Sequence, residues 1–138
     1  MFFKKKEYKE EDNFLIKIAS LLIHAAKIDE NYTEEEEKII KDTLIQLGSN
    51  SESINELIEK AKAMEENSNQ ILDFTREVKN LKEDEKIKIV EALWKIIYSN
   101  KDADMYETNL MRRLAGLLYI DNKVMGDIKE KIKNEKSL

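Results

Sequence analysis

The chain has 138 residues, 38% of them charged and 41% hydrophobic, with a formal net charge of −5, and it is long enough for one domain with its own core. The negative charge argues against nucleic-acid binding, and the absence of cysteine excludes disulfides, thiolate metal ligands and a cysteine nucleophile. Proline is also absent and only three glycines occur, so the composition predicts an all-α, single-domain bundle of long helices.

The first predicted helix spans residues 12–27, because its apolar residues form one broad stripe. The single histidine, His24, falls on the opposite, polar stripe, where we expect it to be solvated. Residues 1–11 are expected to form a flexible basic tail ahead of a helical domain at residues 12–134. Two phenylalanines and three lysines near the start also allow a peripheral contact with an anionic membrane, although so few apolar groups anchor only weakly.

About seven helices are expected in all. Apolar periodicity places the later ones at about residues 34–47, 51–64, 68–81, 83–99 and 105–118, with a short last helix after Asp121. Gly48 supplies a left-handed residue at the C-terminus of the second helix. The helix at residues 83–99 is apolar on nearly three faces, which predicts a central and most buried position.

One motif occurs twice, 71 residues apart. The segments IDENYTEEEEKII (Ile28–Ile40) and SNKDADMYETNLM (Ser99–Met111) each follow an apolar helix, pass through an acidic loop and open the next helix. We interpret them as a pseudo-duplicated helix–acidic loop–helix unit. Halves of this kind often pack with pseudo-symmetry, which would bring the two loops together.

Helix capping explains most of this motif. Thr33 with Glu36, and Asp104 with Glu107, have the spacing of a capping box. In such a box the first side chain accepts the N3 amide, and the N3 carboxylate accepts the N-cap amide. Acidic residues in the first turn also interact favourably with the helix dipole. Each cap stabilises its helix by about 1 kcal/mol.

A divalent-metal site is the alternative interpretation. Oxygen-bearing side chains alternate along both loops, a pattern that can bind Ca²⁺, Mg²⁺ or Mn²⁺ if the loops meet in space. A calcium EF-hand is excluded, because its loop needs glycine at the sixth position and glutamate at the twelfth. The residues at those positions are Glu34, Ile40, Met105 and Met111. The candidate ligands of a different site are Asp29, Asn31, Glu36, Asn100, Asp102, Asp104 and Glu107.

We do not expect an enzyme. Dinuclear bundle enzymes use paired Glu-x-x-His motifs, but this chain has one histidine and no such motif. It also lacks a glycine-rich phosphate loop and a Ser–His–Asp set. Arg112, Arg113 and the lysines at positions 129, 131 and 133 are interpreted as a solvated face rather than a nucleic-acid surface.

An aromatic pair allows two interpretations. Trp94 and Tyr98 lie one turn apart on the helix at residues 83–99, and such a pair usually packs in the core. The alternative is a partner-binding groove lined by Trp94, Tyr98 and Tyr106. The sequence leaves both open, because aromatic side chains serve cores and interfaces alike.

HAAKIDENYTEEEEKII and EALWKIIYSNKDADMYETNLMRRLAGLL together resemble the two halves of the TerB-like family, the tellurite-resistance protein B domain. The resemblance extends over about residues 12–131. It implies an all-helical fold of about seven helices and a non-enzymatic role in stress and tellurite-resistance systems. It also implies divalent-cation binding through the paired loops and scaffolding of partner proteins in the cytoplasm, at the inner face of the membrane.

The resemblance places loop acids at Asp29, Glu36, Asn100, Asp104 and Glu107. The family usually has Asp-Gly in each loop, whereas this chain has Asp29-Glu30 and Asn100-Lys101. Without glycine a left-handed turn costs more free energy, and an amide beside a lysine attracts a cation less than a carboxylate does. A purely structural adaptor of the co-chaperone kind, which binds partners without a metal, therefore stands beside the metal-binding interpretation.

Overall fold

The computed structural model describes residues 2–27, 33–67, 74–75, 78–79, 81–99 and 105–137, with the backbone alone for residues 2–13, 105–108 and 136–137. Regular structure within these residues is helical, which confirms the all-α prediction. The helices are α1 (Phe2–Ala26), α2 (Glu34–Gln46), α3 (Ile54–Glu66), α5 (Glu83–Ser99), α6 (Met105–Leu117) and α7 (Asn122–Ser137). None of them, in this part of the chain, has the length and apolar character that crossing a lipid bilayer requires.

Helix boundaries agree closely with prediction for α2, α5 and α6, whereas α3 was expected at about residues 51–64 and spans Ile54–Glu66, and the helices at both chain ends differ more. α5 has the predicted bounds, and α2 and α6 each end one residue earlier than expected. The predicted start of the first helix was wrong, because α1 begins at Phe2; the flexibility of residues 1–11 stays a prediction. The last helix is not short, since α7 has 16 residues and includes the charged C-terminal segment up to Ser137. The helix expected at residues 68–81 lies largely outside the described residues.

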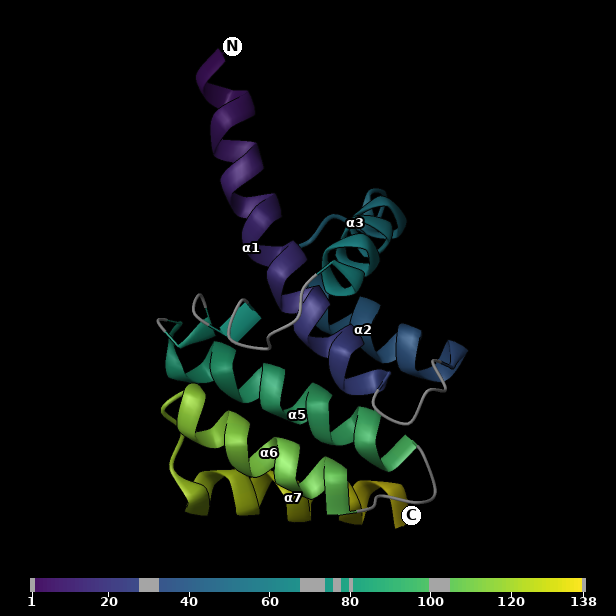
Figure 1. The fold of residues 1–138 in the computed structure, drawn as a ribbon, viewed down its shortest axis with the longest axis vertical. Helices are drawn as coiled ribbons and strands as arrows, with labels where there is room; N and C mark the ends of the chain where they lie inside the picture. The colour runs from purple at the N-terminus through teal and green to yellow at the C-terminus, as the bar shows by residue number, and fades with distance from the viewer. Residues whose placement is uncertain are drawn as a thin grey trace.

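The described helices form two groups that pack against each other (Figure 1). One group is α1, α2 and α3, and the other is α5, α6 and α7. Within the groups the most extensive contacts join α1 to α3 and α5 to α7, and the groups meet where α5 packs against α1 and α2. The N-terminal half of α1 extends out of the bundle, away from the other helices.

The C-terminal half of α1 occupies the centre of the bundle. Over Phe14–Ala26 three side chains are partly exposed and the others are buried. The apolar pattern predicted this central position for α5, and the structure shows that the two helices share it. The Ser20 hydroxyl, fully buried, lies 2.7 Å from the Ile16 carbonyl oxygen and 3.2 Å from that of Ala61 in α3. The only hydroxyl in this stretch is therefore satisfied by backbone acceptors, as burial of a polar group requires.

α2 and α6 end in the same hydrogen-bonded motif. In α2 the Ser49 amide donates to the Leu44 carbonyl at 2.9 Å, and the left-handed residue is Gly48, with φ 112°. In α6 the Ile120 amide donates at 2.9 Å to the carbonyl five residues earlier, and the left-handed residue is Tyr119, with φ 56°. Both ends are Schellman motifs. Each residue of the α6 motif lies 71 positions after its counterpart in α2, the spacing that separates the acidic loops in the sequence.

Gly48→Ala should lower the free energy of unfolding by about 1 kcal/mol, because alanine is strained at this positive φ even though the methyl group has open space. Gly116→Ala is the matched control. Open space surrounds that position as well, but its backbone is helical, so the unfolding free energy should rise by about 0.5–1 kcal/mol. Urea denaturation measures both values, and changes of the same sign would contradict the left-handed helix end at Gly48.

Candidate functional site

The structure describes only part of the predicted set of metal ligands. Asp29, Asn31, Asn100, Asp102 and Asp104 lie outside the described residues. Glu107 lies in the first turn of α6, but its side chain is outside them too. Glu36 is the remaining candidate, and its side chain is described. Among the described residues, no three His, Cys, Asp or Glu side chains are grouped so that they could hold a metal ion, and the loop site stays a prediction.

Glu36 forms the capping box that the sequence predicts. Its Oε1 accepts the Thr33 amide at 2.8 Å, and the Thr33 hydroxyl accepts the Glu36 amide at 3.1 Å. Glu36 is fully buried, so its carboxylate is shielded from water at the N-terminus of α2. Three further glutamates complete an acidic first turn, where negative charge interacts favourably with the helix dipole. The capping interpretation is confirmed for the first loop, and the equivalent box at the second loop falls outside the described side chains.

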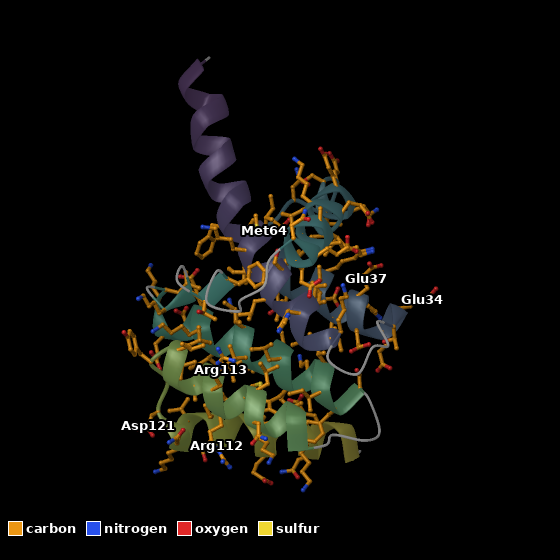
Figure 2. The ribbon with its side chains drawn as sticks, in the orientation of Figure 1. Glu34, Glu37, Met64, Arg112, Arg113 and Asp121 are labelled. Carbon is orange, nitrogen blue, oxygen red and sulfur yellow. The ribbon has the colours of Figure 1, made fainter. Side chains whose placement is uncertain are left out.

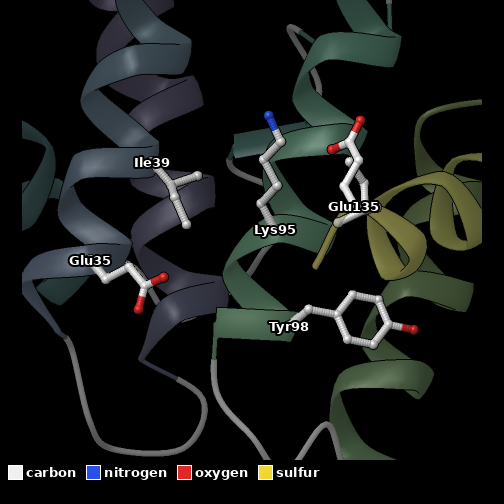
Figure 3. A pocket seen from close by; sticks show the side chains of 6 residues that line it. Glu35, Ile39, Lys95, Tyr98 and Glu135 are labelled. Carbon is white, nitrogen blue, oxygen red and sulfur yellow. The ribbon is translucent and has the colours of Figure 1, made fainter. Parts of the chain in front are cut away.

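A pocket of about 260 Å³ lies between α2, α5 and α7 (Figure 3). Its lining residues are Glu35, Ile39, Lys95, Tyr98, Ile132 and Glu135. Glu35 lies in the first turn of α2, just after the first acidic loop, and Tyr98 lies in the last turn of α5, just before the second. The start of α2 and the end of α5 therefore meet at one end of the bundle (Figure 1).

The contribution of α7 to this pocket was not predicted, because the last helix was expected to be short. The available signal was a stripe of apolar residues at helical spacing, Met125, Ile128 and Ile132, all of which are buried. Burial of Ile132 holds the C-terminal half of α7 against the bundle, and this brings Glu135, less than one turn further on, to the pocket.

The pocket has an apolar and aromatic wall. Ile132 is buried and Ile39 is half-buried. The half-buried Tyr98 stacks on Trp94, with 5.9 Å between ring centroids, and Trp94 is only 4% exposed, which confirms core packing for the tryptophan. Burial raises the pKa of the Tyr98 hydroxyl above its ordinary value, and the negative charge of Glu130 raises it further. The side chain of the third aromatic considered for a groove, at position 106, lies outside those described.

Ion pairs connect α3 to α2 and to the C-terminal end of α1. One oxygen of Glu65 lies 3.3 Å from His24 Nδ1, and the other lies 2.8 Å from Lys27 Nζ. Lys62 Nζ lies 3.0 Å from Glu37 Oε1, and this hydrogen bond raises the pKa of the Lys62 ammonium. His24 is half-buried on the polar stripe of α1, and it contributes to the α1–α3 contact there.

The charged side chains that line the pocket differ in their ion pairing from those that join α3 to α1 and α2. Glu35, Lys95 and Glu135 are exposed, and within the described part of the chain none of them has an ion-pair partner. Arg112 and Arg113 are also exposed, and they project from α6 (Figure 2). Glu35 and Glu135 line the same cavity from different helices, whereas the two arginines do not line it.

A protein-family model described as "Tellurite resistance protein TerB" matches residues 15–130, which include both acidic loops and most of the described helices. The chain belongs to the TerB family. The resemblance seen in the two repeated segments is thereby confirmed, and membership in the TerB family indicates a helical module of the tellurite-resistance type. Searches of curated proteins and of solved structures found no match to this chain.

Thr33→Ala should lower the free energy of unfolding by about 1 kcal/mol, because it removes the hydroxyl that accepts the Glu36 amide at the start of α2. Ser53→Ala is the matched control, since Ser53 has the same N-cap position in α3 but makes no side-chain capping bond. We expect the control to change the value by less than about 0.5 kcal/mol. Chemical denaturation measures the free energy of unfolding of both variants, and equal losses of that free energy would contradict a specific cap at Thr33.

Tyr98 should ionise above pH 10.0, the ordinary value for tyrosine, because burial and the charge of Glu130 both disfavour the phenolate. The raised pKa favours the neutral phenol in the folded chain. Its contribution to stability is therefore present below pH 10 and is lost as the pH rises through the folded pKa. The difference between the tyrosinate absorbance titrations of the unmodified chain and Tyr98→Phe isolates this group. Glu130→Gln should lower the midpoint, and a Tyr98 midpoint at or below 10.0 would contradict the burial.

Proposed function

We propose that this TerB-family protein is a non-catalytic helical module that binds partner proteins in stress or tellurite-resistance systems, in the cytoplasm at the inner face of the membrane. The observation that carries the proposal is the pocket joining the start of α2 to the end of α5, because both acidic loops connect to the bundle there. A non-catalytic role is supported by the single histidine, which contacts Glu65 between α1 and α3.

We further propose that the two loops bind a divalent cation, Ca²⁺, Mg²⁺ or Mn²⁺. The candidate ligands remain Asp29, Asn31, Glu36, Asn100, Asp102, Asp104 and Glu107. Carboxylate and amide oxygens are the donors that these hard cations prefer. The meeting of Glu35 and Tyr98 at one pocket supports a shared site, since it brings the attachment points of the two loops to the same end of the bundle.

The two halves of the chain are inferred to be copies of one three-helix unit. α2 and α6 both have 13 residues and start 71 residues apart, as the left-handed residues at their ends also do. After each end an amide bonds to an Asx side chain two residues earlier at 2.9 Å, Glu52 to Asn50 and Lys123 to Asp121. In such a duplication the acidic loops are equivalent segments, which supports their acting together.

A structural adaptor without a metal is the second candidate, and one observation favours it. Glu36 Oε1 accepts the Thr33 amide inside the α2 N-terminus, so the described member of the ligand set already stabilises a helix. Capping is sufficient to explain why a glutamate stands at this position. In this case the loops serve to start α2 and α6 correctly, and partner binding uses the packed helices alone.

Thermal melting with Ca²⁺, Mg²⁺ or Mn²⁺, compared with melting in the presence of a chelator, distinguishes the cation-binding module from the metal-free adaptor. A bound cation stabilises the fold by about 2.7 kcal/mol at a concentration a hundred times its Kd. We expect one cation to raise the melting temperature and to shift the NMR amide signals of Asn31 and Asp102. Asp29→Asn should remove the effect, whereas the control Glu34→Gln, an exposed residue in the first turn of α2, should keep it. No stabilisation by any of the three cations would leave the metal-free adaptor.

A further inference from the structure

We propose that the pocket between α2, α5 and α7 receives an arginine or lysine side chain of a partner protein. This inference rests on the proposed function as a partner-binding module, and it specifies the chemistry of the partner. Three properties of the pocket carry it: its size, its apolar and aromatic wall, and the charges at its edge.

The pocket has the size of a single side chain. Its volume is about 260 Å³, whereas pockets for drug-sized ligands and cofactors usually hold about 300–1,000 Å³. Three helices supply its lining, so its shape depends on the packing of the bundle and not on a loop. Nucleotides and comparable cofactors usually occupy larger pockets, whereas one side chain presented by a second protein fits this volume.

The wall suits the aliphatic part of a long basic side chain. Ile39 on α2, Ile132 on α7 and Tyr98 at the end of α5 all line the pocket. Lysine and arginine side chains pack their methylene groups on such apolar surface while the charged end reaches water or a carboxylate. The aromatic ring adds attraction, because a cation is favoured over the face of a tyrosine.

The charges at the edge favour a cation. Glu35 and Glu135 come from different helices that border the pocket, and within the described residues neither has an ion-pair partner. Glu130, which does not itself line the pocket, is near enough to Tyr98 to raise the pKa of its hydroxyl. Lys95 is the one basic residue that lines it, so carboxylates outnumber ammonium groups. An arginine between two carboxylates can form charge-assisted hydrogen bonds with either.

Lys95 distinguishes this occupant from other ligands. A zwitterionic or acidic ligand would bind the Lys95 ammonium, and removing that charge would weaken its binding. A basic side chain is repelled by Lys95, so removing the charge would strengthen its binding. The sign of the effect of one substitution therefore separates the two classes of ligand.

The first experiment is an NMR titration of the ¹⁵N-labelled full chain with the peptide acetyl-Gly-Ser-Arg-Ser-Gly-amide in buffer with EDTA. The control peptide has citrulline in place of arginine, which keeps the shape and removes the charge. We expect the arginine peptide to shift the amide signals of Ile39, Tyr98 and Ile132, and the citrulline peptide to leave them in place. Equal shifts with both peptides, or unchanged pocket signals, would overturn the proposal. EDTA removes divalent cations, so this failure is distinct from a failure of cation binding at the loops.

The second experiment repeats the titration with charge variants. Glu35→Gln and Glu135→Gln should each weaken binding of the arginine peptide about two- to fivefold, as expected for an exposed ion pair, and Lys95→Gln should tighten it by a similar factor. Glu34→Gln is the matched control. Glu34 is exposed in the same turn of α2 but does not line the pocket, so the affinity should stay nearly unchanged.

Two results of the variant series would overturn the proposal. Equal weakening by Glu34→Gln and Glu35→Gln would reduce the effect to a diffuse attraction of the acidic helix terminus for cations. Weakening by Lys95→Gln would assign the pocket to a zwitterionic or acidic ligand. Thermal melting of each variant confirms that it is folded, and these exposed substitutions should change stability by less than about 0.5 kcal/mol.

Discussion

The packing of α1 against α5 is the constraint on which the rest of the bundle depends. The C-terminal half of α1 and most of α5 are too apolar to face water on any broad side, so each is covered by a partner, α3 for α1 and α7 for α5. α2 contacts both of the central helices. The end of α5 and the start of α2 consequently lie together at the pocket, and both acidic loops attach at that end of the bundle. Burial of apolar surface, which has no direction of its own, thus places the start of α2 beside the end of α5, although the two are far apart in sequence.

Polar groups divide into those that stabilise the bundle and those that leave charge at its surface. Ser20 satisfies backbone carbonyls in the core, and the buried Lys86 donates to the Leu118 carbonyl at the end of α6 at 3.1 Å. A cation at a helix C-terminus is favourable there because the last carbonyls carry partial negative charge. Glu65 likewise joins α3 to α1 through two contacts. Among the described residues, Glu35 and the other charged groups at the pocket make no comparable contact, which leaves them free to meet a partner.

The likeness of α2 and α6 extends to their hydrogen bonds but not to the residues that make them. At the equivalent left-handed position α2 has Gly48 and α6 has Tyr119, whose side chain is 73% exposed. A tyrosine is disfavoured in that conformation because its Cβ approaches the backbone. The Lys79 ammonium lies 5.8 Å from the centre of its ring and provides a compensating cation–π contact. The geometry of the helix end is therefore maintained by the surrounding fold even where the local residue opposes it.

The sequence by itself determined the helical class, the bounds of α5, the start of α2 with its capping box, and the left-handed Gly48 that follows α2. These features follow from interactions within a few residues: apolar periodicity, a Thr-x-x-Glu spacing and a glycine. The TerB family was also evident in it, from two long ungapped segments. Only the tertiary structure decided that His24 meets Glu65, that α7 continues to Ser137, and that Glu35 and Glu135 line one cavity with Tyr98. These facts depend on which helix covers which face, and that choice is made by the complementary shapes of buried side chains from distant parts of the chain.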